Sequence, residues 1–116
     1  MAVQMRPGQA LRLWHDVSLD LVRGGEPDLS TRQLTVLITI YLDPQPHTVR
    51  ALAAKLGVTK PVITRALDTM GGYGLVTRKR DPADRRNVLV QRTVEGALFL
   101  ERLGDLVVSR AATLPS

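Results

Sequence analysis

The side chains best suited to binding a polyanion gather in one short stretch, residues 75–93, which reads LVTRKRDPADRRNVLVQRT. Its two ends, 75–80 and 88–92, carry the apolar and β-branched residues typical of strands, and a polar turn with a proline separates them. This pattern predicts a hairpin whose tip, 81–87, projects from the protein. A basic finger on a two-stranded arm suits a nucleic-acid groove, because phosphates are anionic and the groove walls are narrow. The cations that it presents are Arg78, Lys79, Arg80, Arg85 and Arg86.

The positive charge is concentrated in the middle of the chain. The formal net charge of the 116 residues is +5. Residues 31–92 contain eleven basic and four acidic side chains, a net charge of +7, whereas 1–30 and 93–116 each carry −1. We therefore expect a polyanion to dock on the middle segment and the two ends to serve another purpose. The alternative interpretation of the same charge is an ordinary solvated surface.

The composition excludes several other kinds of chemistry. The chain has no cysteine, which rules out a disulfide framework, a thiolate zinc site and a cysteine redox sensor. His15 and His47 are far apart in sequence and a metal site needs three or four converging ligands, so no metal or other cofactor is expected. Asp81 and Asp84 resemble an acid–base pair, but they lie on an arginine-rich turn without a predicted pocket, so the chain is not expected to be an enzyme. Aromatic residues are too scarce for stacking on single-stranded bases.

The sequence predicts neither secretion nor a membrane partner. Residues 1–8 lack an apolar run, and no segment approaches the roughly 20 apolar residues of a membrane span. A chain of this length fits one domain, 1–116. We therefore expect a single-domain, cytoplasmic protein that associates with the nucleoid.

Two helices are predicted within the first 42 residues. After a loose start, apolar residues at helical spacing predict a helix over 10–23. A second helix, over 31–42, begins with a capping-box pattern of Ser30 and Gln33. Pro44 lies just beyond it, where a proline cannot continue the hydrogen-bond ladder.

Two short helices follow with a tight turn between them. Thr48 is placed to cap a helix over 49–56, and Gly57 follows where a left-handed residue is needed. The next helix, over 60–70, has a proline in its first turn, where the missing donor is not required. Together these two helices predict a helix-turn-helix.

The last predicted helix, over 94–112, carries apolar residues on nearly all sides. A helix that is apolar on several sides is buried on several sides, which in so small a protein indicates a partner chain. The resulting fold class is mostly α with a small β-hairpin wing (α+β), a winged helix-turn-helix. Residues 31–92 are its expected DNA-binding core, and 10–23 and 93–112 are its expected dimerisation helices.

Three stretches of the sequence resemble the multiple-antibiotic-resistance regulators, the MarR family. They are LAAKLGVT at 52–59, GLVTR at 74–78, and RDPADRR at 80–86 followed by Val88 and by TVEG at 93–96. The resemblance extends from about residue 31 to residue 103. The wing motif is the more specific signal, since helix-turn-helix sequences are common.

The resemblance implies a bacterial-type transcriptional regulator that binds duplex DNA as a homodimer on a pseudo-palindromic site. The helix from Lys60 would lie in the major groove and Arg86 at the wing would reach the minor groove. Asp84 corresponds to the family's wing carboxylate, which orients the arginine through an ion pair. Two features depart from the family: the segments before and after the core are short, and Arg92 stands where an apolar residue commonly precedes the threonine.

The expected roles differ along the basic segment. Arg65, with Thr64 beside it, is the candidate for reading guanine, and its alternatives are a phosphate contact or a salt bridge with Asp68. Residues at the start of the same helix are expected to meet phosphate. Arg78 and Arg80 either flank phosphates or brace the wing. The complete set of predicted DNA-binding residues is Thr59, Lys60, Pro61, Thr64, Arg65, Arg78, Arg80, Arg85 and Arg86.

Two other interpretations remain open. The first is a winged-helix module that binds another protein and has little affinity for DNA. The second is a regulator that responds to a small molecule, for which a pocket would have to lie near Leu11, Trp14, Leu37, Tyr41 and the last helix. No polar constellation in the sequence identifies such an effector. The sequence also leaves open the operator, the regulated pathway and whether regulation is positive or negative.

Overall fold

The computed structural model describes residues 3–25 and 27–115. The chain divides into two compact units, one formed by Leu29–Leu100 and the other by Met1–Asp28 together with Glu101–Ser116. We call them the central unit and the terminal unit. None of the helices in the described part of the chain is long and apolar enough to cross a lipid bilayer.

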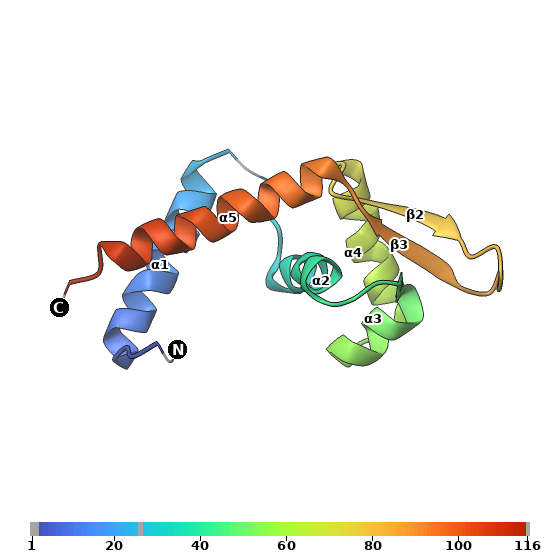
Figure 1. The fold of residues 1–116 in the computed structure, drawn as a ribbon, viewed down its shortest axis with the longest axis horizontal. Helices are drawn as coiled ribbons and strands as arrows, with labels where there is room; N and C mark the ends of the chain where they lie inside the picture. The colour runs from blue at the N-terminus through green and yellow to red at the C-terminus, as the bar shows by residue number, and fades with distance from the viewer. Residues whose placement is uncertain (1–2, 26, 116) are drawn as a thin grey trace. The chain divides into compact units, whose positions relative to one another are not determined.

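The central unit contains three helices, a small sheet and the start of a fourth helix (Figure 1). Three of the predicted helices have the bounds expected from the sequence, and the helix predicted over 60–70, α4, runs two residues further than expected. The first strand of the hairpin begins at Val76, one residue later than expected, and Leu75 lies just before it. The elements are α2 (Thr31–Leu42), β1 (His47–Thr48), α3 (Val49–Leu56), α4 (Lys60–Gly72), β2 (Val76–Arg80), β3 (Val88–Arg92) and α5 (Val94–Ala112).

The helix ends show why these segments fold locally. The Ser30 hydroxyl accepts a hydrogen bond from the Gln33 amide at 3.1 Å, and the Gln33 side chain accepts one from the Ser30 amide at 2.8 Å, which completes the predicted capping box. Thr48 caps α3 by accepting from the Ala51 amide at 3.0 Å. Gly57 adopts φ 69° between α3 and α4, a conformation in which a side chain would be strained.

The three strands form an antiparallel sheet in the order β1-β3-β2. His47 pairs with Val90, so His47 and Thr48 form a brief strand, and Thr48 also caps α3 as predicted. Val76 and Val90 are buried on one face of the sheet. Arg78 lies opposite Val90 in the register, so its side chain leaves the same face.

The core of the central unit lies among the helices and the inner face of the sheet. Helix α2 is buried on two sides, and Val36, Leu37 and Ile40 are its fully buried apolar positions. Two sides are covered because α2 contacts both α4 and β3. The buried apolar side chains are Val36, Leu37, Ile40, Val49, Leu52, Ala53, Ile63, Ala66, Leu67, Met70, Leu75, Val76, Val90 and Phe99.

The terminal unit contains α1 (Pro7–Arg23) and the end of α5. The loose start expected at 1–9 is wrong for its last three residues, because Pro7 begins the helix and Gln9 accepts from the Arg6 amide at 3.0 Å; Met1 and Ala2 lie outside the described residues. Of the expected apolar stripe on α1, Val17 is buried, whereas Trp14 is 66% exposed in the single chain.

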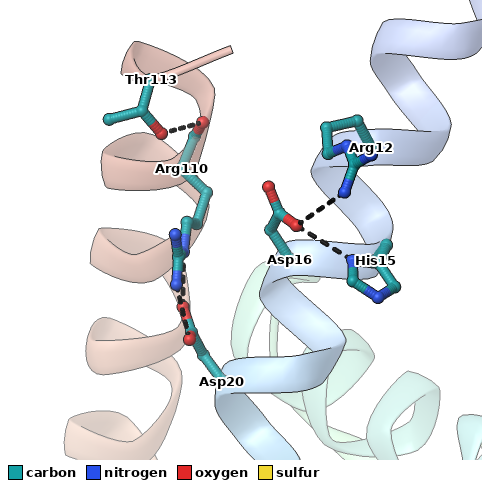
Figure 2. Close-up of polar contacts among 6 residues, drawn as sticks. All are labelled: Arg12, His15, Asp16, Asp20, Arg110 and Thr113. Carbon is teal, nitrogen blue, oxygen red and sulfur yellow. Dashed lines mark hydrogen bonds and ion pairs between the residues drawn. The ribbon is translucent and has the colours of Figure 1, made fainter.

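Figure 2 shows polar contacts of α1 and of the end of α5 in the terminal unit, among which the Asp20–Arg110 pair joins the two helices. Arg110 donates to both carboxylate oxygens of Asp20, at 2.6 and 2.7 Å, and this pairing lowers the pKa of the Asp20 carboxyl. One turn earlier, Asp16 contacts His15 at 2.9 Å and Arg12 at 3.8 Å. The unit is therefore held by an ion pair between residues 90 positions apart.

Candidate nucleic-acid interface

The outer face of α4 presents the residues that the sequence indicated. Ile63, Ala66 and Leu67 are buried against the core, which turns the opposite side of the helix to solvent. Thr59 stands at the N-cap position but makes no capping hydrogen bond with its side chain. The exposed residues on this side are Thr59, Lys60, Pro61, Thr64 and Arg65.

The structure separates two of the alternatives for Arg65. Asp68, its expected salt-bridge partner, instead pairs with Arg78, whose Nη2 lies 2.6 Å from the Asp68 Oδ1. Within the described part of the chain, no ion pair is found for Arg65. Its guanidinium is therefore available to a base or a phosphate.

Arg78 connects α4 to the wing, since Asp68 lies on α4 and Arg78 on β2. Figure 1 shows β2 and β3 extending past the helices of the central unit as a two-stranded arm. Arg80, further along the same strand, donates from Nη1 to the backbone carbonyl of Arg85 at 3.1 Å. Both contacts agree with the bracing role that the sequence left open for these two arginines.

The wing turn is ordered by its own backbone and side chains. Asp81 accepts from the Ala83 amide at 2.9 Å and donates its own amide to the Asn87 carbonyl at 3.0 Å. The Asn87 amide in turn donates to the Asp84 carbonyl at 2.9 Å. Short-range hydrogen bonds of this kind are what allow aspartate and asparagine to fix a turn. The loop between the strands is thus a defined structure that can present a side chain in one direction.

Arg86 is held at the tip by Asp84 through three hydrogen bonds. The guanidinium donates from Nε to Oδ1 and from Nη2 to Oδ2, each at 3.0 Å, and the Arg86 amide donates to Oδ1 at 3.1 Å. The side-chain hydrogen bonds lower the pKa of the Asp84 carboxyl, and the backbone bond and the nearby charge of Arg50 lower it further. The same pairing raises the pKa of the Arg86 guanidinium. Arg86 nevertheless stays 82% exposed, so the pair aims a cation outward without burying it.

A second polar cluster joins α2, the residues just before β2 and the start of α5 inside the central unit, and we call it the junction. The Tyr41 hydroxyl donates toward the carbonyls of Thr93 and Leu75, at 3.0 and 3.2 Å, and accepts from the Thr93 amide at 2.9 Å. The Thr93 hydroxyl accepts from the Gly96 amide at 2.9 Å and donates to the Gly74 carbonyl at 2.7 Å. A side chain at Gly96 would overlap the Tyr41 hydroxyl and the Leu75 carbonyl.

At the junction, the contacts of Arg92 account for an arginine at a position where an apolar residue is common in the family. Its Nε donates to the Ile40 carbonyl at 2.9 Å and its Nη2 to the Asp43 carbonyl at 3.0 Å, which satisfies the end of α2. The guanidinium also lies 5.6 Å from the centre of the Tyr41 ring. No local pattern indicated this contact, because the partners are about 50 positions apart in the sequence.

The candidate interface lies on one compact unit and combines two elements. The part of the chain that the structure describes contains no cluster of three or more histidine, aspartate or glutamate residues able to hold a metal ion. The predicted residues of α4 and of the wing all belong to the central unit, where the Asp68–Arg78 pair links the two elements. The site therefore combines an exposed basic helix face with an aimed arginine.

Comparison with known proteins gives consistent matches. The model of the MarR family matches residues 29–88. An organic hydroperoxide resistance transcriptional regulator of Bacillus subtilis (strain 168) is 37% identical over 59 residues, 51% of this chain and 40% of that protein. The transcriptional regulator HosA of Escherichia coli O111:H- is 36% identical over 84 residues, 70% of this chain and 62% of that protein. The chain thus spans about two-fifths and three-fifths of the lengths of these relatives.

A solved structure resembles the whole fold. The transcriptional repressor CouR, bound to a 23-mer DNA duplex, has a TM-score of 0.71 and 25% sequence identity to this chain. The alignment covers 95% of this chain and 83% of that one. The helix-turn-helix with a β-hairpin wing that the sequence predicted is thereby confirmed as the fold class.

Proposed function

Because the chain belongs to the MarR family, we propose that it is a transcriptional regulator that binds double-stranded DNA sequence-specifically, as a homodimer on a pseudo-palindromic site. The family match covers the helix-turn-helix and the wing tip, the two elements that would contact the duplex. CouR, a repressor of similar fold, is bound to a DNA duplex in its structure. The relatives with matching sequence are regulators by name, which agrees with the expectation that this chain is not an enzyme.

The observation that carries the proposal is the paired Asp84 and Arg86 at the wing tip. A guanidinium is the donor set suited to a narrow, electronegative groove. An arginine free to rotate would lose side-chain entropy on binding, but the Asp84 carboxylate already fixes its direction. The exposed face of α4 supplies the element that fits a major groove, with Arg65 and Thr64 toward base edges and Lys60 toward phosphate.

Dimerisation through the first and last helices is the second part of the proposal. Large apolar side chains on α1 and on the end of α5 are exposed in the single chain, which is costly unless another surface covers them. They include Leu11, Trp14, Val22, Val107 and Val108. Light scattering should give the mass of a dimer, and Trp14→Glu should shift that mass toward the monomer. A monomer at all concentrations would contradict this part of the proposal.

DNA binding is tested by selecting bound fragments from random DNA and then titrating the selected duplex at fixed salt. A palindromic consensus is expected for a twofold-symmetric dimer. Arg86→Ala and Arg65→Ala should each weaken binding about tenfold or more. Arg6→Ala, which removes the same charge just before α1 begins, is the matched control and should bind as the wild type does.

Salt dependence separates this proposal from a protein-interaction module of the same fold. Affinity for DNA must fall steeply as salt rises, because bound phosphates release counterions. Wild-type affinity in the Arg86→Ala protein would reject the wing assignment. No salt-dependent binding to any duplex by the wild type would reject DNA binding altogether and favour the module.

A further inference from the structure

A polar hollow lies between the start of α2 and the outer side of α4. Its volume is about 230 Å³, and it opens to solvent. Both elements belong to the central unit, so their relation is set by the core that Val36, Leu37 and Ile63 share. The residues that matter in its wall are Ser30, Arg32, Gln33, Val62, Arg65 and Thr69.

The charge in this hollow is of one sign. Arg32 and Arg65 line it, and no acidic side chain does. Within the described part of the chain neither arginine has an ion-pair partner. Two guanidinium groups that line one concavity repel each other unless an anion lies between them. The hollow is therefore electrostatically suited to an anionic group.

The hydrogen-bonding groups around the hollow point to the same class of ligand. The oxygens of Ser30 and Gln33 are already occupied as acceptors in the capping box. The remaining polar groups of the wall are mainly hydrogen-bond donors. The chief ones are the two guanidinium groups, which pair well with phosphate oxygens. The Thr69 hydroxyl donates to the Arg65 carbonyl at 3.3 Å and so stays close to the backbone of α4.

The position of the hollow identifies the source of the anion. Arg65 belongs both to the hollow and to the α4 face proposed to enter the major groove. A helix in that groove is flanked by the sugar–phosphate backbone on each side. We propose that the hollow holds a backbone phosphate of the bound duplex, and that Arg32 on α2 is its main ligand. This inference rests on the proposed DNA binding and adds α2 to the surface that contacts DNA.

The test uses a mixed-sequence DNA duplex, because a phosphate contact does not depend on base sequence. Affinity is measured by fluorescence anisotropy over a series of salt concentrations for the full-length wild type, Arg32→Gln and the control Arg6→Gln, which removes an exposed charge before α1 begins. Arg32→Gln should weaken binding several-fold and reduce the slope of log affinity against log salt by about one per bound protomer. The control should keep the wild-type slope, and circular dichroism should show equal folding of all three proteins.

The outcomes separate this inference from the proposed function. If the wild type binds with a steep salt dependence and Arg32→Gln has the same affinity and slope, the hollow is not a phosphate site and DNA binding still stands. A wild type that binds no duplex overturns both. A second measurement addresses free anions: millimolar inorganic phosphate added to the protein without DNA should not shift the Arg32 amide signal in NMR spectra. A saturable shift, together with unchanged DNA affinity of Arg32→Gln, would assign the hollow to a free anion instead.

Discussion

Arg86 and Arg92 lie six positions apart in one hairpin, yet they hold entirely different partners. Arg86 pairs with a carboxylate two residues away and remains almost fully exposed. Arg92 reaches carbonyls about 50 positions away and lies over the Tyr41 ring. The tip is thus organised by its neighbours in sequence, whereas the junction is organised by the fold. We expect changes at the junction to alter stability first and changes at the tip to alter binding first.

The largest effect should come from Gly96→Ala at the junction. The added methyl group overlaps the Leu75 carbonyl and the Tyr41 hydroxyl, and a backbone carbonyl cannot move aside as a flexible side chain would. We expect a loss of about 3 kcal/mol in the free energy of unfolding. Thermal and urea unfolding followed by circular dichroism measure it.

Gly104→Ala is the matched control on the same helix. A methyl group there meets nothing within 4 Å, and alanine favours a helix over glycine by about 0.5–1 kcal/mol. The control should therefore leave stability unchanged or raise it. Equal stability of the two variants would show that the close approach at Gly96 has no energetic consequence.

Tyr41→Phe should have the next largest effect. It keeps the ring under Arg92 but removes the hydroxyl that pairs with the Thr93 amide and the Leu75 carbonyl, whereas the Thr93 carbonyl still accepts from the Ala97 amide at 3.0 Å. Unsatisfied half-buried groups of this kind cost about 1–3 kcal/mol. The midpoint of urea unfolding should fall while DNA affinity, measured where the variant is fully folded, stays within about twofold of the wild type. A large loss of affinity without a loss of stability would contradict the division between tip and junction.

For Asp84→Asn, we expect DNA affinity to change in the direction opposite to that expected from the charge alone. Removing a negative charge beside DNA should strengthen binding, but here it also removes the group that aims Arg86. We expect affinity to fall about three- to tenfold with little change in the melting temperature, because an exposed ion pair contributes little to folding. Asp81→Asn in the same turn removes the same charge and can still accept from the Ala83 amide, so its affinity should be equal or higher. If both variants bind more tightly than the wild type, Asp84 has no orienting role.

The smallest effect should be a shift in the titration of Asp84. Its folded pKa lies below the ordinary aspartate value of about 3.9, chiefly because of its hydrogen bonds with the Arg86 side chain. The ion pair therefore makes its whole, small contribution to the free energy of folding when the pH is above that ordinary value. The contribution is lost as the pH falls through the lowered pKa of the folded protein. Carbon-detected NMR should give a midpoint below 3.9 in the wild type and a higher one in Arg86→Ala. Identical midpoints in both proteins would contradict the assigned cause.

The predicted elements follow from local signals that the structure retains. The capping box at Ser30 and the glycine at position 57 placed α2 and α3 correctly, because both act within a few residues. The start of α1 was missed, since Arg6 is an unusual N-cap and the capping role falls to the Gln9 side chain. The end of α4 was missed because Gly71 and Gly72 continue the helix despite their low propensity.

The site was predictable in part for the same reason. The Asp84–Arg86 pair is local and its motif was visible, whereas the Asp68–Arg78 pair and the Arg92 contacts depend on tertiary packing. The exposed apolar side chains of α5 were expected to be buried on several sides, yet Val94, Leu98 and Val108 are exposed in the single chain. Whether a second chain covers them stays a prediction.

The ion pair between Asp68 and Arg78 would limit the spacing that an operator can have. With β2 tied to α4, the helix and the wing tip keep a constant offset, so on a duplex they must meet their grooves at a constant number of base pairs apart. One base pair inserted between the two contacts rotates the DNA duplex by roughly a tenth of a turn and carries one contact out of reach. Such operators should therefore tolerate a changed base far better than an added one.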